Sequence, residues 1–155
     1  MISLAELTKD GPAAGEMSDM TEEEKLRSNA ALAVKTLGPH SDVAAFGFDR
    51  ESVAWVEGYI ERQRIRPDMT DETKNGLISV LGSFLGECII HLHGGQWRRD
   101  EIGWGVHFDG GNVAYPFSKV QKLMTNGLEG GGSIVSFLDT TGVLFKRKRP
   151  WWKFW

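Results

Sequence analysis

The amino-acid sequence predicts an α+β domain in which N-terminal helices pack on one face of a small antiparallel β-meander, followed by short C-terminal helices. Apolar residues recur with a helical period near 3.6 over residues 21–92, and the period changes to about 2 over residues 96–115. An Asp-Gly-Gly-Asn turn at residues 109–112 lies in the second region. Helices followed by strands favour an antiparallel sheet over parallel βαβ units.

The first two helices are predicted from their capping residues and apolar stripes. Thr21 and Glu24 form a capping box, so we expect a helix over residues 21–37, ended by the Gly-Pro pair that follows. Asp49 is the expected N-cap of a second helix over residues 50–64. The stripes expected to be buried are Leu26, Ala30, Ala33, Val34 and Leu37 in the first helix, and Val53, Val56 and Ile60 in the second, with Trp55 and Tyr59 beside them.

A third and longer helix is predicted to begin after Thr70 and to end at the glycine pair 94–95. It is apolar on most of its surface, so we expect it to be central, with partners on more than one side. Gly82 and Gly86 lie one turn apart, and each would otherwise cost about 1 kcal/mol relative to alanine in a helix. We therefore expect neighbouring elements to approach this helix closely at both glycines.

Three short strands are predicted over residues 96–99, 104–108 and 112–115. The two glycines of the intervening Asp-Gly-Gly-Asn turn allow the positive φ angles of a tight hairpin. Alternation along the second strand places Trp104, Val106 and Phe108 on one face, for which we expect burial.

The C-terminal third is predicted to hold short helices. Pro116 opens a helix that Asn126 and Gly127 close, and residues 130–132, three glycines, are expected to form a flexible joint. Helical spacing returns at Ile134, Val135, Phe137 and Leu138. Residues 143–145 are expected to form a last strand or an extended lead into the tail.

Length and composition predict one globular domain. The chain has 155 residues, of which 41% are hydrophobic and 25% charged, enough for a core without disulfides or metals. Residues 1–20 are rich in small and polar side chains and are predicted to be a flexible lead. Residues 21–145 are the predicted single α+β domain, and residues 146–155 form a separate tail.

Cysteine content and the N-terminus favour a cytoplasmic location. The one cysteine, Cys88, lies in an apolar run and is interpreted as a buried residue of a protein from a reducing compartment. The N-terminus lacks the basic and apolar regions of a signal peptide, and no stretch reaches the roughly 20 uncharged apolar residues of a membrane span.

Charge is divided unequally along the chain. Before residue 146 there are 13 cations and 21 anions, a net charge of −8, whereas the ten residues that follow carry five cations and no anion. Phosphate recognition requires basic charge on the folded face, so the acidic body argues against a nucleic-acid-binding domain.

The C-terminal tail is predicted to contact another surface. Exposed tryptophan is scarce in soluble domains, yet three of the chain's six tryptophans stand here beside the basic run. This surface is either a protein partner or an anionic membrane, and a membrane would imply peripheral association at the inner membrane face. The alternative is that the tail contacts no other surface and is disordered or folded back on the acidic body. The predicted contact residues are Lys146, Arg147, Lys148, Arg149, Trp151, Trp152, Lys153, Phe154 and Trp155.

A polar pocket is predicted where the third helix meets the first strand. Glu87 and His91 share one helix face at i, i+4 spacing, and Trp97 and Arg98 follow in the strand, so these four residues could bind a small polar ligand. The alternative is a structural pair, in which Glu87 forms a salt bridge with His91 or with an arginine of the second helix. His93 is expected to point away from Glu87.

Two further arrangements have a functional and a structural interpretation. Arg62, Arg64 and Arg66 at the end of the second helix could converge with the strand arginines near Glu87 to clamp a carboxylate or phosphate, or they could complement the helix dipole. His107 and Asp109 flank the hairpin turn and suggest a metal, although a turn aspartate more commonly bonds its own backbone.

No specific catalytic motif is present. The glycine-rich stretches lack the helix start and the Lys-Ser/Thr pair of phosphate-binding loops, no Gly-x-Ser-x-Gly sequence occurs, and the paired histidines of a zinc-protease helix are missing. We therefore expect no enzymatic activity, no cofactor and no metal.

A resemblance supports this expectation. Residues 50–145 contain a helix with Leu-Gly-Glu at 85–87, a Gly-Gly-Gln-Trp segment at 94–97 and a Pro-Phe-Ser-Lys-Val helix start at 116–120. In these features the chain resembles a poorly characterised class of small bacterial α+β domains, some of which resemble immunity proteins that neutralise a secreted toxin. The resemblance implies a protein-binding module, and an acidic body would suit a basic toxin. The C-terminal tail is not part of it.

Overall fold

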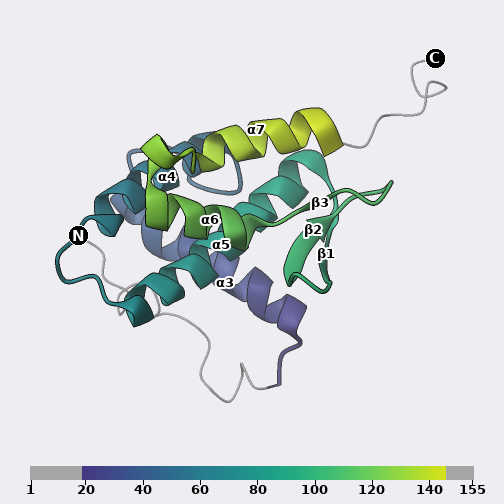
Figure 1. Ribbon diagram of the computed structural model, residues 1–155, viewed down its shortest axis with the longest axis horizontal. Helices are drawn as coiled ribbons and strands as arrows, with labels where there is room; N and C mark the ends of the chain where they lie inside the picture. Colours follow the sequence, from purple (N-terminus) through teal and green to yellow (C-terminus); the bar gives the residue numbers. More distant parts are fainter. Residues whose placement is uncertain (1–18, 146–155) are drawn as a thin grey trace.

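The computed structural model describes residues 19–145 and confirms the predicted α+β fold (Figure 1). The flexible lead predicted for residues 1–20 falls almost wholly outside the described residues, as does the tail at 146–155. The helices are α3 (Glu22–Leu37), α4 (Arg50–Arg64), α5 (Asp71–His93), α6 (Pro116–Asn126) and α7 (Ile134–Phe145); short 3-10 turns are η1 (Gly38–His40) and η2 (Leu128–Gly130); the strands are β1 (Gln96–Arg99), β2 (Trp104–His107) and β3 (Val113–Ala114).

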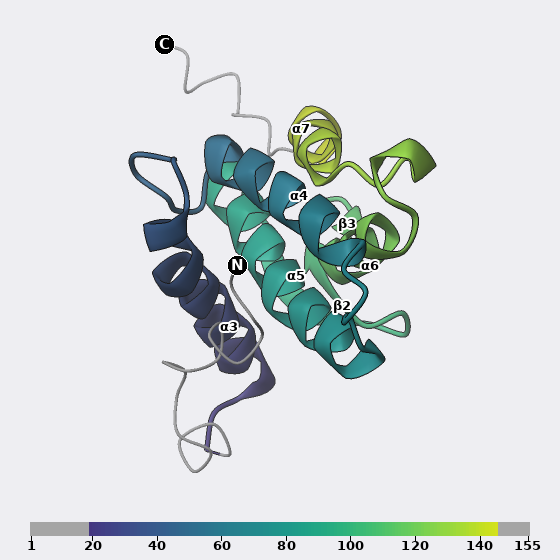
Figure 2. The same ribbon diagram turned by 90° about the vertical axis from the view of Figure 1, so that its left-hand side faces the viewer.

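The long helix α5 is central, as its apolar surface predicts. In Figure 2, α3 lies on one side of it, while α6, α7 and the sheet lie on the other. Over the described residues α5 alone is long and apolar enough to cross a membrane, but most of it is buried by the other elements. Its apolar character is therefore explained by its position in the core.

The predicted helix starts are confirmed by their caps. The Thr21 hydroxyl accepts from the Glu24 amide at 3.1 Å, and the Glu24 carboxylate accepts from the Thr21 amide at 2.8 Å. Asp49 caps α4 by accepting from the Ser52 amide, and Thr70 caps α5 by accepting from the Thr73 amide. The end of α3 differs in detail, because Gly38 keeps a right-handed conformation and the chain continues into η1.

The close approach predicted at the two α5 glycines is confirmed. A Cβ atom on Gly86 would lie well under 3.0 Å from the Trp97 ring, and one on Gly82 would overlap the Phe117 ring. The Trp97 and Phe117 ring centroids are 5.8 Å apart, so the two aromatic side chains cover adjacent turns of α5. These contacts position β1 and α6 on the central helix.

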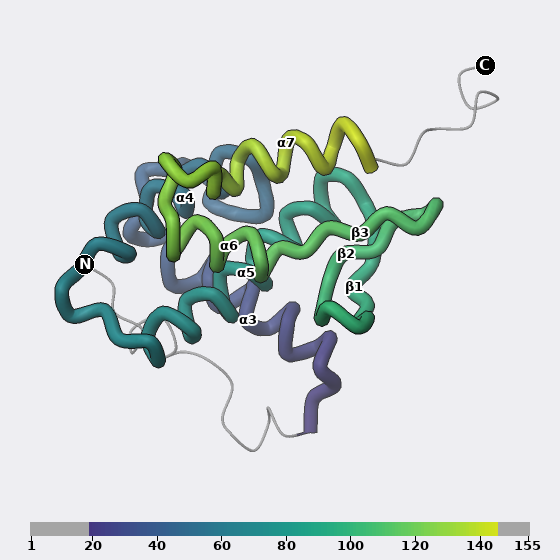
Figure 3. Tube along the Cα trace, viewed as in Figure 1, coloured from purple at the N-terminus to yellow at the C-terminus, as the bar shows by residue number. Residues whose placement is uncertain are grey.

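The sheet is a three-stranded antiparallel meander in the order β1-β2-β3, with Trp97 opposite Val106. Val106 and Phe108 are buried as expected, whereas Trp104 at the start of β2 is half-buried. β2 and β3 are shorter than predicted. Phe108 and Asn112 belong to the turn, where the Phe108 amide donates to the Asn112 carbonyl at 2.8 Å, and Tyr115 is the N-cap of α6. Figure 3 shows this turn projecting from the body of the protein.

The predicted strand or extended segment at residues 143–145 is wrong, because α7 continues through Phe145. The sequence around Gly142 resembles a helix end, but this glycine lies flat against the His93 ring, where any Cβ atom would collide. The Phe145 ring then packs 5.6 Å from Phe108. Tertiary contacts thus explain a glycine that a helix otherwise disfavours.

The glycine run at 130–132, predicted to be a flexible joint, forms a hydrogen-bonded turn in the structure. The Gly130 and Gly132 amides both donate to the Gly127 carbonyl, and Gly132 packs against the backbone of Leu123. The turn joins α6 to α7, and the Glu57 and Glu61 carboxylates of α4 accept from amides at the start of α7 and η2.

Candidate functional site

The four residues predicted to form a polar pocket line one cleft. Glu87 and His91 come from the C-terminal part of α5, and Trp97 and Arg98 come from β1; the cleft has a volume of about 410 Å³. Its remaining lining residues are Glu23, Arg27, Ile90, Gly95 and Gln96. Sequence patterns did not reveal the contribution of α3, because the packing of α3 on α5 is a tertiary contact.

Local geometry explains how α5 and β1 meet at this cleft. Gly94 and Gly95 both have positive φ, 87° and 95°, which lets the chain reverse after α5. β1 then runs back beside the helix and places the Trp97 indole over Gly86. Glu87 is the next residue of α5, so its carboxylate and the indole are brought to the same region.

The cleft contains polar groups that the protein itself does not satisfy. Glu87 is 8% exposed, and its carboxylate forms no hydrogen bond or ion pair with the residues that the structure describes. Trp97 is 4% exposed, and its Nε1 atom is buried without an acceptor in the described part of the chain. A buried N–H donor without a partner is costly, and an unpaired carboxylate lines the same cleft, which makes this the strongest candidate for a binding site.

The predicted salt bridge between Glu87 and His91 is not formed. The His91 Nδ1 atom lies 2.8 Å from the main-chain carbonyl of Glu87, and the ring packs 4.7 Å from Phe48. His93 points elsewhere, as expected: its Nε2 atom lies 3.1 Å from the Leu138 carbonyl in α7. The two histidines therefore serve different contacts.

The predicted convergence of the α4 arginines near Glu87 is wrong. Arg62 lies over the Trp55 ring, and Arg66 pairs with Asp68. Arg64 donates to the Met124 and Thr125 carbonyls at the end of α6. All three arginines contact partners outside the cleft, and Arg64 alone of the three is shown to bond a helix end, that of α6.

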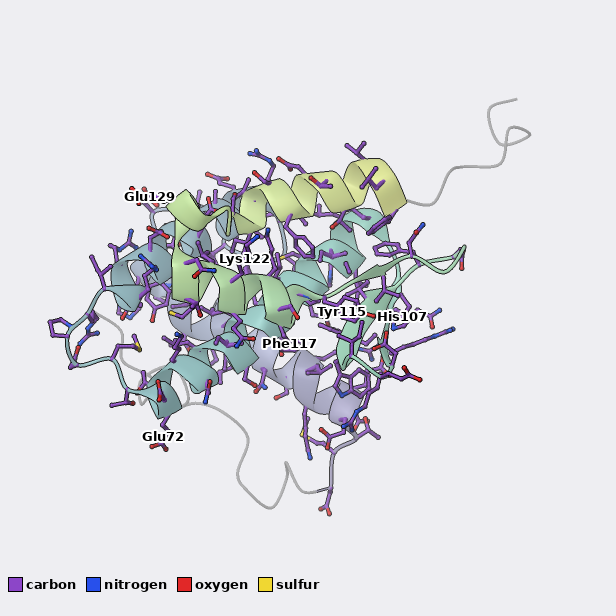
Figure 4. The ribbon with its side chains drawn as sticks, in the orientation of Figure 1. Glu72, His107, Tyr115, Phe117, Lys122 and Glu129 are labelled. Atoms are coloured by element: carbon purple, nitrogen blue, oxygen red, sulfur yellow. The ribbon has the colours of Figure 1, made fainter. Side chains whose placement is uncertain are left out.

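The second predicted pair, His107 and Asp109, is replaced by a different cluster. Asp100 lies between Tyr115 and His107: the Tyr115 hydroxyl donates to the Asp100 carboxylate at 2.5 Å, and the His107 Nε2 atom is 3.5 Å from it. Figure 4 labels both side chains: His107 belongs to β2, and Tyr115 directly follows β3. Asp100 also accepts from the Ile102 and Gly103 amides, so it stabilises the turn between β1 and β2.

Asp100 should make stability depend on acid pH. The Tyr115 hydrogen bond and the turn amides hold the pKa of Asp100 below its usual value of about 3.9. The folded state therefore favours the carboxylate, and its contribution is complete above the unfolded-state pKa and lost as pH falls through the lowered pKa. We expect Asp100→Asn to flatten the decrease in melting temperature below about pH 4. Identical slopes for wild type and Asp100→Asn would contradict this role.

Two further features bear on covalent and metal chemistry. Cys88 is fully buried, as predicted, and burial raises the pKa of its thiol, which makes it a poor nucleophile. Over residues 19–145 there is no group of three or more side chains placed to hold a metal ion.

The C-terminal end of α7 is a second candidate site. Val143 is 84% exposed and Leu144 is 63% exposed, although both belong to the last turn of a helix whose other apolar residues pack inward. The basic and aromatic tail, residues 146–155, follows immediately and lies outside the described residues. Two aliphatic side chains are thus presented to solvent where the tail begins.

Comparison with protein-family models, curated proteins and solved structures finds no match to this chain. The resemblance to immunity-type domains stays a prediction. The structure gives its short motifs a physical role, because Trp97 packs on Gly86 and on Phe117.

Proposed function

We propose that this protein is a non-enzymatic binding protein that attaches to an anionic membrane surface through its C-terminal end. The observation that carries the proposal is the exposure of Val143 and Leu144 on the last turn of α7, directly before five cations and four aromatic rings. Apolar and cationic groups at one end of a chain match a surface of anionic headgroups above an apolar layer.

The positive charges of the tail contribute a favourable electrostatic free energy of membrane binding. Each Lys or Arg near an anionic leaflet contributes about 1 kcal/mol, so five contribute on the order of 5 kcal/mol. The body before residue 146 has a net charge of −8 and opposes part of this attraction. The separation of charge along the chain favours an orientation in which the tail faces the membrane and the acidic body faces the cytoplasm.

Apolar groups add a second contribution. Full burial of a Val or Leu side chain is worth about 1.5–3 kcal/mol, and aromatic rings are favourable at the level of the headgroups. Val143 and Leu144 would therefore extend the contact of the tail onto the folded domain. The apolar helix α5 is not available for this contact, since it is the core helix.

Vesicle co-sedimentation tests the proposal. We expect the full chain to bind vesicles of phosphatidylcholine with phosphatidylglycerol, and not vesicles of phosphatidylcholine alone. Deletion of residues 146–155 should weaken binding at least about a hundredfold, and Val143→Ser with Leu144→Ser should weaken it about tenfold. Ile65→Ser is the control, because Ile65 is 72% exposed but belongs to the end of α4. Undiminished binding after removal of the tail would overturn the proposal.

A protein partner is the second candidate function. The acidic body favours a basic partner, such as the toxin that an immunity-type protein would neutralise, and tryptophan and arginine in the tail are residue types enriched at interface hot spots. Here the whole protein would act as a cytoplasmic bacterial inhibitor. Affinity capture from the native lysate should recover one stoichiometric protein with the full chain, and capture of none would count against this candidate.

A further inference from the structure

The cleft between α3, α5 and β1 carries an inference separate from membrane attachment. Its deepest charged group is Glu87, with 8% of its surface exposed and no cation within salt-bridge distance over residues 19–145. An unpaired carboxylate that lines a cleft attracts a bound cation or strong hydrogen-bond donors. The cleft that Glu87 lines is therefore suited to an ammonium group.

Strand β1 contributes hydrogen-bond donors and a positive charge, which favour an anion. The Trp97 Nε1–H group is buried without an acceptor, and the adjacent residue Arg98 is exposed and has no carboxylate partner in the described part of the chain. An N–H donor and a guanidinium favour a carboxylate, which accepts hydrogen bonds from both.

The remaining walls leave these groups free for a ligand. Arg27 and Glu23 of α3 pair with each other at 2.7 Å, so each neutralises the other. The His91 Nδ1 atom lies against the Glu87 carbonyl, which can only accept, so Nδ1 carries a hydrogen in this contact. The charges of Glu23, Arg27, Glu87 and Arg98 sum to zero.

We propose that this cleft binds a small zwitterion of the amino-acid type, with its ammonium group on Glu87 and its carboxylate on Arg98 and the Trp97 N–H. A ligand with one positive and one negative charge pairs with both Glu87 and Arg98. Because its own net charge is zero, the net charge of the cleft stays zero. The volume of about 410 Å³ suits a small molecule. Ile90 and the Trp97 ring provide an apolar wall for its side chain.

Three probes that share the leucine side chain test the proposal. They are L-leucine, L-leucinamide, which lacks the carboxylate, and N-acetyl-L-leucine, which lacks the ammonium group. Each is titrated into the full chain while the indole N–H resonance of Trp97 is followed by NMR, assigned with Trp97→Phe. We expect a saturable shift with L-leucine at millimolar concentration, and binding about tenfold weaker or more for each blocked probe. The absence of a saturable shift with L-leucine, or equal shifts with all three probes, would overturn the proposal.

Two variants separate the roles of the charged groups. Glu87→Gln should reduce the affinity for L-leucine to that for N-acetyl-L-leucine, and Arg98→Gln should reduce it to that for L-leucinamide. Arg98 is exposed, so its variant remains informative if Glu87→Gln fails to fold. Arg99→Gln is the matched control, because Arg99 follows in the same strand but does not line the cleft. The titrations contain no vesicles, so their outcome is read separately from vesicle binding. Arg98 also borders the hollow that Leu144 and Phe145 line, so Arg98→Gln is assayed on vesicles as well.

Discussion

Replacing Gly86 with alanine should lower the free energy of unfolding by about 1–3 kcal/mol, although alanine is the better helix former. The reason is steric: a Cβ atom at this position would occupy the space of the Trp97 ring. The indole cannot move freely, because it also packs against Phe117. The substitution therefore forces β1 away from α5 or strains the helix.

Gly58→Ala provides the matched control in α4. A Cβ atom there would lie 3.3 Å from the Nη1 atom of Arg62, the flexible end of a side chain, and would meet no backbone. This substitution should raise the free energy of unfolding by up to about 1 kcal/mol. Urea denaturation measures both effects, and a Gly86→Ala protein as stable as the wild type would show that the Trp97 contact is loose.

Replacing Phe84 with alanine should cost about 3–5 kcal/mol of stability, the largest effect that we expect from a single residue. Phe84 is fully buried, and its ring lies 5.7 Å from Phe46 and 5.9 Å from Phe48. Both partners come from the segment between α3 and α4, so the cavity would loosen that segment as well as the core of α5.

Two other substitutions serve as controls for the stability loss of Phe84→Ala. Phe84→Leu keeps most of the volume and should cost less than about 1.5 kcal/mol. Ile102→Ala, at a side chain that is 72% exposed, should change stability by no more than about 0.5 kcal/mol. Hydrogen exchange at residues 42–49 should accelerate in Phe84→Ala alone. A loss similar to that of Ile102→Ala would contradict the assignment of Phe84 to the centre of the core.

The candidate cleft was only partly predictable. Glu87 and His91 stand four residues apart in one helix, and Trp97 follows the same chain reversal, so their proximity follows from local patterns. The pair of Arg27 with Glu23 comes from α3, far away in sequence, and only packing brings it to the cleft. Whether the Glu87 carboxylate finds a partner also depends on the positions of all the side chains around it, which come from several elements.

The cluster of Asp100, Tyr115 and His107 was also only partly predictable from the sequence. The turn at Asp100 has a local signal, because an aspartate three residues before a glycine is a common turn sequence. The hydroxyl of Tyr115 reaches that carboxylate only because β2 lies between the first and third strands. The sequence suggests His107 beside Asp109, whereas the structure brings His107 to within 3.5 Å of Asp100.

The amino-acid sequence alone determines the helix starts at Thr21, Asp49 and Thr70, the tight turn between β2 and β3, and the central position of α5, because these features depend on residues within a few positions of one another. Tertiary structure decides which aromatic ring covers each α5 glycine, why α7 passes through Gly142, and which charges in the cleft are left unpaired. Those outcomes depend on side chains that are distant in the chain and meet only when the core is packed.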